Sequence, residues 1–187
     1  MSRRPKVVLI TGVQAAGKST LAPVLADHLG PPSMALDGDV FYSAVRAGHA
    51  RMGPDPDPEA VRQLRLRYEA SALVANHYAA SGFHVVIADV VLGEDVTAWM
   101  ERIASAERHL VVLNPGPEVV LARERGRGGD SYRDWDHGSG SPAEGVRTLQ
   151  EFLEQGPRRG LWLDTSALDP SQSVEAILAD GMAGSRY

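Results

Sequence analysis

The feature that most constrains the fold of this chain is a short segment near its N-terminus. Residues 12–19 read Gly-Val-Gln-Ala-Ala-Gly-Lys-Ser, which satisfies the pattern Gly-x-x-x-x-Gly-Lys-Ser/Thr at every fixed position. An apolar, β-branched run at residues 6–10 precedes the segment directly, and a helical pattern follows it. This is the context that the pattern requires, so we predict a phosphate-binding loop (P-loop) between a first strand and a first helix.

The residue types of this loop suit the binding of a nucleotide. Glycines let the backbone curl so that N–H groups converge on a phosphate, Lys18 adds a cation at the β- and γ-phosphate oxygens, and the Ser19 hydroxyl ligates Mg²⁺. The guanine-specific sequence Asn-Lys-x-Asp is absent, which favours ATP. The alternative is a plain glycine turn. The predicted nucleotide-binding residues of the loop are Gly12, Ala15, Ala16, Gly17, Lys18, Ser19 and Thr20.

The composition limits the number of domains, the metal sites and the partners that we expect. The chain has 187 residues, 43% of them apolar and 23% charged, which fits one globular domain spanning residues 1–187. It has no cysteine, which excludes disulfides and thiolate metal sites. No secretory signal is expected, and no apolar run approaches the roughly 20 residues of a membrane span. A net charge of −5 argues against nucleic acid as a partner. We expect a cytoplasmic protein that binds neither membrane nor nucleic acid; its oligomeric state is left open.

Strand-like and helix-like segments alternate along the chain. Such alternation predicts an α/β fold, a three-layer sandwich with a parallel sheet of about five strands whose ligands bind at the carboxyl ends of the strands. After the first strand, the expected strands lie near residues 34–36, 85–88, 110–113 and 161–163, and the expected helices near 21–28, 61–82, 96–103, 142–153 and 170–179.

The segment at about residues 125–141 is predicted to be a mobile lid. It is rich in Gly, Asp, Ser and Arg and shows no helical or strand period. The sequence from Ser141 to Glu144 has the pattern of a capping box with proline at the first helical position, so we predict that a helix begins there.

Carboxylates follow two of the predicted strands. Phosphoryl transfer to a hydroxyl needs a carboxylate near the acceptor and usually a second one that holds the water shell of the metal. We assign Asp39 as the base or acceptor-orienting group, with Asp37 as the competing candidate, and Asp89 as the group that holds Mg²⁺-bound water or the acceptor. The structural alternatives are a turn that Asp37 closes on its own backbone and a helix N-cap at Asp39.

Arginines precede and open the predicted lid. Arg123 and Arg127 are four residues apart and share a helix face, so a closing lid would bring one of them to the transferring phosphoryl group. The alternative is a solvated basic helix C-terminus. A second group, Arg62, Arg65 and Arg67, is expected to be surface rather than to contact substrate.

With these residues in hand, the chain resembles the chloramphenicol phosphotransferase-like branch of small P-loop kinases, from Val7 to about Ile177. Residues 87–93, Ile-Ala-Asp-Val-Val-Leu-Gly, are similar to the family's third-strand segment ending in Asp-x-x-Leu-Gly. The pairs Arg123-Glu124 and Arg127-Gly128 are similar to its lid arginines. Asp39 falls where the family places its acceptor-activating aspartate.

The resemblance implies a function and further site residues. It implies a P-loop kinase-type fold and transfer of the γ-phosphoryl group of Mg·ATP to a hydroxyl of a small molecule, most readily an antibiotic or a related metabolite. It also implies that Thr165 and Ser166, after the last strand, help to frame the adenine. Residues 36–39, Leu-Asp-Gly-Asp, are equally similar to gluconate and adenylylsulfate kinases.

Two other functions compete with this one. One is a nucleoside, nucleotide or sugar kinase; the other is a nucleotide-dependent switch or a zeta-toxin-like sugar-nucleotide kinase. The chain departs from the family pattern between Phe41 and Arg67, where it carries Tyr42, Arg46 and His49. Its lid residues 130–137 are also its own and offer substrate contacts.

Overall fold

The computed structural model of the chain describes residues 4–104, 106–129, 131–132, 135 and 138–187. Within the lid segment 130–137, for which substrate contacts were expected, the described residues are Ser131, Tyr132 and Trp135. Asp130, Arg133, Asp134, Asp136 and His137 lie outside the described residues.

The fold is built on a five-stranded parallel sheet with the order β2-β3-β1-β4-β5. Strand β1 lies between β3 and β4, where Val8 is paired with both Val86 and His109. Residues 7–10 of β1 are completely buried, as their uninterrupted apolar run predicts for a strand covered on both faces. The predicted α/β fold is confirmed. The strands are β1 (Lys6–Thr11), β2 (Ser33–Asp37), β3 (His84–Ala88), β4 (Glu107–Leu113) and β5 (Leu161–Leu163).

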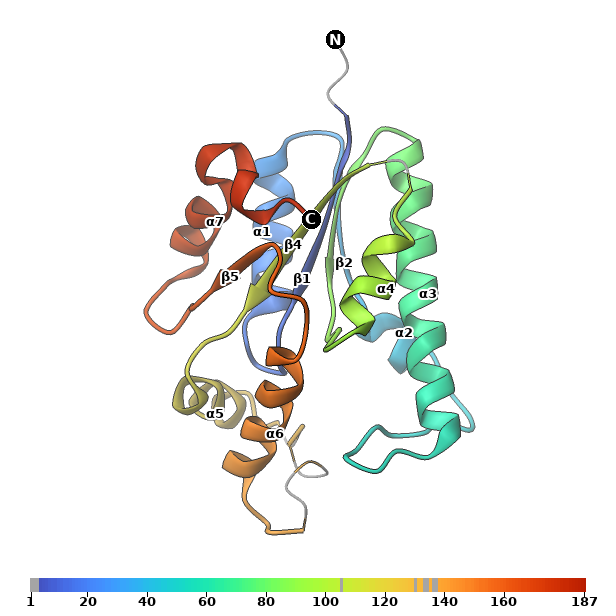
Figure 1. Cartoon of the computed structure of the whole chain (residues 1–187), viewed down its shortest axis with the longest axis vertical. Coiled ribbons are helices and arrows are strands. Elements are labelled where there is room, and N and C mark those ends of the chain that lie inside the picture. Colours follow the sequence, from blue (N-terminus) through green and yellow to red (C-terminus); the bar gives the residue numbers. More distant parts are fainter. Residues whose placement is uncertain (1–3, 105, 130, 133–134, 136–137) are drawn as a thin grey trace.

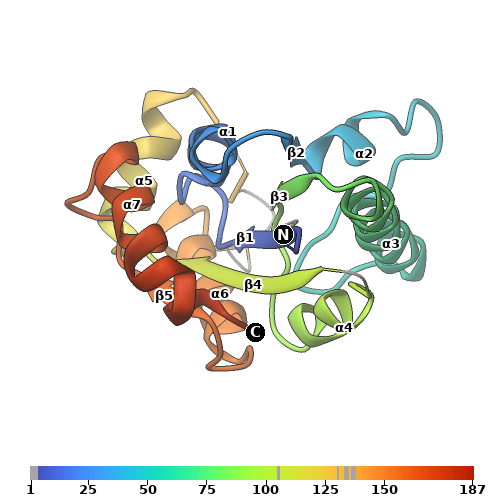
Figure 2. The same ribbon diagram turned by 90° about the horizontal axis from the view of Figure 1, so that it is seen from above.

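Helices cover both faces of the sheet and so make three layers. Figure 2 shows α1 and α7 on one side and α3 and α4 on the other, while α5 and α6 lie beyond the carboxyl ends of the strands (Figure 1). Among the described helices, none combines the length and apolar character that crossing a bilayer requires. The helices are α1 (Lys18–Leu29), α2 (Asp39–Ser43), α3 (Pro58–Ala80), α4 (Asp95–Glu101), α5 (Pro117–Gly126), α6 (Pro142–Glu154), α7 (Pro170–Leu178) and the short 3₁₀ helix η2 (Ala179–Ser185).

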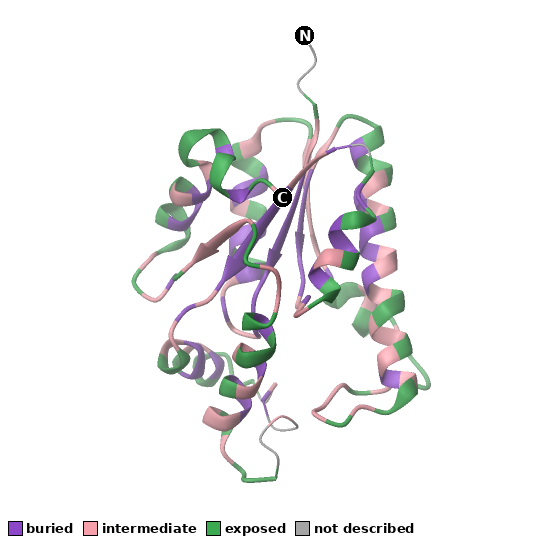
Figure 3. Ribbon diagram, viewed as in Figure 1, coloured by how far each residue is buried: buried purple, intermediate pink, exposed green. Residues whose placement is uncertain are grey.

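Buried residues concentrate in the sheet and on the helix faces turned toward it (Figure 3). A buried polar contact joins the two helices of one layer, because the Trp99 indole in α4 donates a hydrogen bond to the Ser71 hydroxyl in α3 (2.9 Å). Burial of an indole N–H requires such a partner. This contact helps to fix α3, which carries an arginine of the candidate site.

The helix predicted to begin after Ser141 is confirmed, with Pro142 as its first residue, but the predicted capping box is wrong. Ser141 occupies the N-cap position of α6, but its side chain makes no capping bond, because the Glu144 N–H donates to the backbone carbonyl of Ser141 (3.0 Å). A capping box is formed instead at α7. There the Asp169 carboxylate accepts from the Gln172 N–H (2.8 Å) and the Gln172 side chain accepts from the Asp169 N–H (2.9 Å).

The topology brings the predicted functional segments to one edge. In a parallel sheet the carboxyl ends of all strands face the same way, so the loops after β1, β2, β3, β4 and β5 meet there. The candidate site residues lie at the end of a strand, in one of these loops or at the start of the helix that follows, except Arg67 on α3, Arg123 on α5 and Arg127 directly after α5.

Candidate active site

The P-loop connects β1 to α1 and depends on two glycines. Gly12 has a φ of 147°, and a Cβ there would collide with the carbonyl oxygen of Leu113. Gly17, at the N-cap of α1, has a φ of 107°, in the region where a side chain is disfavoured. Because Gly17 brings no capping side chain, the first-turn N–H groups of α1 remain available to an anion.

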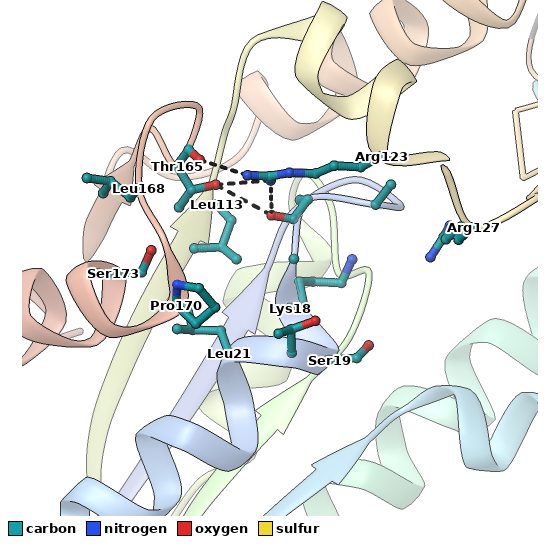
Figure 4. Close-up of a pocket in the computed structure, with 14 residues that line it drawn as sticks. Lys18, Ser19, Leu21, Leu113, Arg123, Arg127, Thr165, Leu168, Pro170 and Ser173 are labelled. Carbon is teal, nitrogen blue, oxygen red and sulfur yellow. Dashed lines mark hydrogen bonds between the residues drawn. The ribbon is translucent and has the colours of Figure 1, made fainter. Parts of the chain in front are cut away.

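A cavity of about 350 Å³ opens beside this loop. Figure 4 shows it between the start of α1, two arginines at the end of α5, and the segment that leads from β5 into α7. The volume and the mixture of apolar and cationic groups suit a nucleotide. The lining residues are Ala15, Ala16, Gly17, Lys18, Ser19, Thr20, Leu21, Leu113, Arg123, Arg127, Thr165, Leu168, Pro170 and Ser173.

Lys18 lies at the floor of the cavity and is 8% exposed. Its ammonium group donates hydrogen bonds to the carbonyls of Gly12 (3.0 Å) and Val13 (2.8 Å). Burial lowers the pKa of Lys18 to about 8, against the opposing effects of Asp89, Asp39 and Asp37. The predicted carboxylates therefore lie within electrostatic reach of the P-loop lysine, as the topology requires.

Arg123 forms one wall of the cavity. Its guanidinium donates to the carbonyl of Ala16 in the P-loop (3.0 Å) and to the carbonyl of Thr165 after β5 (2.8 Å). Both Arg123 and Thr165 line the cavity. Ser166 instead bonds within the framework, because its hydroxyl accepts from the Gly116 N–H (2.8 Å) and donates to Asp164. It shapes the loop that carries Thr165.

The pair of aspartates after β2 divides into two roles. The Asp37 carboxylate accepts from the backbone N–H of Asp39 (3.0 Å) and closes a turn, which agrees with the structural alternative for that residue. The N-cap of α2 is Gly38, not Asp39, so the capping alternative for Asp39 is wrong. With its side chain 73% exposed, Asp39 presents a carboxylate that a ligand can reach.

A buried arginine joins the two predicted acceptor-side carboxylates. Arg67 projects from α3 with only 10% of its side chain exposed. Two of its nitrogens contact Asp89: Nε donates to Oδ2 (3.1 Å), and Nη2 pairs with Oδ1. The same Nη2 also lies 3.3 Å from Asp39 Oδ1. The expectation of a surface location is wrong for Arg67, whereas Arg62, 62% exposed and paired with Glu59, agrees with it.

Desolvation and a neighbouring charge shift the pKa of Asp39 in opposite directions. Partial desolvation by the surrounding protein raises the pKa of the Asp39 carboxyl, even though much of the side chain is exposed, and Arg67 opposes that rise. For Arg67 itself, burial works against the charge, but Asp89 and Asp39 hold its pKa above the usual value. Arg67 therefore favours the ionised form of Asp39.

Asp89 is held from several sides at the end of β3, and its side chain is fully buried. Besides Arg67, its Oδ1 accepts from the Val90 N–H (2.7 Å). The following segment is fixed by the Tyr68 hydroxyl, which donates to the Val90 carbonyl (2.6 Å). A Cβ on Gly38 would collide with the Asp89 carboxylate, so glycine is needed between the two aspartates of the β2–α2 turn.

Arg127 lines the cavity directly after α5, where the predicted lid begins. Its Nε donates to Glu124 Oε2 (2.6 Å), and half of its side chain is exposed. Arg125 turns elsewhere and donates to the carbonyl of Leu121 (3.3 Å). The structure thus brings Arg123 and Arg127 to one cavity, as their four-residue spacing predicts.

Several residues of the site escaped the sequence reasoning. Arg67 had a usable signal in the sequence, because it lies three residues after Leu64 and next to Tyr68, and apolar residues at such helical spacing indicate a buried face. Leu168, Pro170 and Ser173 had none, because they complete the cavity from a segment with no motif.

Comparison with known proteins agrees with this geometry. A family model described as "Chloramphenicol phosphotransferase-like protein" matches residues 5–180, which confirms the resemblance predicted from the sequence. A cytidylate kinase of Chloroflexus aggregans is 38% identical over 106 residues, 57% of this chain and 44% of that protein. The chain spans less than half the length of the curated relatives it matches.

Solved structures share the fold. A sugar kinase from Janibacter sp. HTCC2649 aligns with a TM-score of 0.67 at 20% identity, over 99% of this chain and 100% of that one. A tunicamycin resistance protein of Deinococcus radiodurans aligns with a TM-score of 0.62 at 22% identity, over 95% of each chain. These likenesses bear on the fold alone.

The lowered pKa of Lys18 predicts how nucleotide affinity depends on pH. The free lysine loses its proton above about pH 8, whereas phosphate oxygens in a complex would hold that proton to higher pH. Affinity for Mg·ATP should therefore be constant below pH 8 and fall above it, by at most about tenfold per pH unit. Calorimetric titration across this range measures it. Lys18→Met should bind more weakly and show no such decline; equal pH dependence in both proteins would contradict the assignment.

Proposed function

We propose that the chain, which belongs to the chloramphenicol phosphotransferase-like family, moves the γ-phosphoryl group of Mg·ATP onto a hydroxyl group of a small molecule. The observation that carries the proposal is the position of Asp39. An exposed carboxylate, paired with a buried arginine, lies at the same edge of the sheet as a P-loop lysine. Phosphoryl transfer to a hydroxyl needs both groups in one site.

The nucleotide side of the proposal rests on the cavity. Its cationic groups and the N-terminus of α1 suit the phosphates, and its apolar end, at Leu168 and Pro170, suits a base. Ser19 is exposed beside Lys18 and offers the oxygen ligand that Mg²⁺ prefers. A bound Mg²⁺ would supply positive charge to the β- and γ-phosphate oxygens, and Ser19 would hold it.

On the acceptor side, we assign a different role to each of three carboxylates. Asp37 is used in a turn, which leaves Asp39 as the group that takes the hydroxyl proton. For Asp89 we propose a role different from the one predicted, because Arg67 already engages both of its oxygens. Asp89 holds Arg67 in place, and Arg67 in turn favours the ionised form of Asp39.

The reaction then follows from these positions. Lys18 exchanges its loop carbonyls for the β- and γ-phosphate oxygens. The acceptor oxygen forms a bond to the γ-phosphorus as the bond from that phosphorus to the β-phosphate oxygen breaks, and the hydroxyl proton passes to Asp39. Arg127, at the cavity mouth, offsets charge on the transferring group, and a closed lid excludes water that would otherwise accept the phosphoryl group.

The charged side chains near Asp39 favour some classes of acceptor over others. Three carboxylates, Asp37, Asp39 and Asp89, lie on the acceptor side, where the Arg67 guanidinium pairs with the last two. Such a surrounding repels a strongly anionic acceptor such as a nucleotide and favours a neutral or cationic one. We therefore place a hydroxylated antibiotic or related metabolite first. The match to a cytidylate kinase over part of the chain makes a nucleoside or nucleotide kinase the second candidate.

The decisive assay supplies Mg·ATP and a panel of hydroxylated antibiotics, nucleosides and sugars, and follows both ADP release and the mass of each acceptor. One acceptor should gain one phosphate. Asp39→Asn should lower transfer at least about a hundredfold while retaining ATP affinity, because it removes the proton acceptor. Asp37→Asn is the matched control and should retain most activity. Normal transfer by Asp39→Asn would refute the assignment of the base.

Arg67 should influence the pH below which the transfer rate falls. Asp39 works ionised, so the rate falls as pH drops through its pKa. Removal of the guanidinium charge raises that pKa and should move the acidic limb of the pH–rate profile to higher pH; loss of the Asp89 charge acts in the opposite sense but more weakly, so the net shift is upward. Because Arg67→Met alone leaves Asp89 buried and unpaired, it is combined with Asp89→Asn.

Arg67→Lys, which keeps a positive charge, is the control for this shift. Its acidic limb should stay close to that of the unmodified protein. If the limb of the double variant also stays in place, Arg67 does not act through Asp39.

A further inference from the structure

A buried glutamate at the end of α5 has no role in the proposed reaction. Glu124 is only 4% exposed, and a buried carboxylate is costly unless it is paired and hydrogen-bonded. Its Oε2 accepts from Arg127 Nε (2.6 Å) and lies 2.5 Å from Arg127 Nη2, while its Oε1 accepts from the backbone N–H of Ser131 (2.8 Å). One side chain thus holds both ends of the turn that opens the lid.

The backbone of the turn packs closely against this carboxylate. The Gly129 N–H donates to the Glu124 backbone carbonyl (3.1 Å), and a Cβ on Gly129 would collide with the carboxylate. Gly128, with a φ of 66°, supplies the left-handed residue that the turn needs. Gly129 and Ser131 therefore both lie where contacts with Glu124 hold them.

The far end of the turn is anchored on the P-loop itself. Tyr132 is 1% exposed, and its hydroxyl donates to the carbonyl of Gln14 (2.5 Å). On its other side, Gly145 of α6 lies so close that a Cβ would meet the Tyr132 carbonyl at 2.6 Å. The turn is fixed relative to the phosphate-binding loop, and the position of Arg127 is fixed with it.

The pairing leaves part of the Arg127 guanidinium for a ligand. A guanidinium has five N–H donors. Within the described part of the chain, Glu124 and Ser131 accept from Nε and Nη2, and no acceptor from that part contacts the two Nη1 donors. A guanidinium held by a carboxylate along one edge is pre-organised to present the rest to a phosphate at little further entropic cost.

We propose that Glu124 is a positioning residue, which orients Arg127 at the mouth of the nucleotide cavity so that its remaining N–H donors meet the transferring phosphoryl group. The inference rests on the proposed function, since it assigns Arg127 to that group. It predicts that Glu124 acts on the transition state through Arg127 and has little effect on the affinity for ADP.

A binding experiment tests this without any acceptor. The purified protein is titrated with Mg·ADP alone and with Mg·ADP plus aluminium fluoride, which mimics the transferring phosphoryl group. Aluminium fluoride should tighten binding to the unmodified protein. Arg127→Ala and Glu124→Gln should each reduce that tightening by about tenfold or more, with the affinity for Mg·ADP alone kept within about threefold.

The double variant separates positioning from general structural support. In the Arg127→Ala background, Glu124→Gln should cost less than about twofold more, because two residues that act as one unit are not additive. Fully additive losses would overturn the proposal, as would a loss confined to Mg·ADP affinity or thermal stability. Glu118→Gln, an exposed change in the first turn of the same helix, is the matched control and should behave as the unmodified protein.

Two further outcomes also test the proposal. If Glu124→Gln does not fold, Glu124→Asp keeps the charge but shortens its reach, and it should lose tightening by an intermediate factor; full tightening would overturn the proposal. No tightening in the unmodified protein would also overturn it. The acceptor panel tests the proposed function separately, so its failure would leave these results interpretable.

Discussion

The burial of β1 between two parallel neighbours is the constraint on which the rest of the structure depends. Its apolar residues are fully excluded from solvent and lock the register to β3 on one side and β4 on the other. This register places the P-loop, the Asp89 segment after β3 and the loop after β4 at one edge. The Thr11 hydroxyl, which donates to the Val91 carbonyl (2.6 Å), ties two of these segments together directly.

At that edge, charge is arranged in two halves that meet at Lys18. The nucleotide half is cationic, with Arg123 fixed to the P-loop and Arg127 fixed by Glu124. The half proposed for the acceptor is anionic, and the buried Arg67 guanidinium there is shared between Asp89 and Asp39. Each buried charge has a partner, as burial demands. The division itself supports a reaction in which an anionic donor meets an acceptor that is not strongly anionic.

Sequence reasoning reached the features that local chemistry determines. The P-loop follows from fixed residues in a fixed context. The central strand β1 follows from its apolar run, because a strand buried on both faces leaves no polar position, whereas the edge strands β2 and β5 are only partly buried and follow from shorter runs. What it missed depends on packing between distant segments. Whether Ser141 or Asp169 closes a capping box, and whether Arg67 faces solvent or Asp89, is decided by neighbours that are remote in sequence. The use of Asp37 in a turn was foreseen as an alternative, because an aspartate two residues before an N–H does this locally.

A structure of the protein with Mg²⁺ and a non-hydrolysable ATP analogue tests the central claim, that the P-loop and Asp39 form one phosphoryl-transfer site, most directly. The account predicts that Lys18 leaves the carbonyls of Gly12 and Val13 for the phosphate oxygens. It also predicts that the γ-phosphorus faces Asp39 across a space that admits one hydroxyl. A γ-phosphate directed away from Asp39, with Lys18 still on the loop carbonyls, would contradict it.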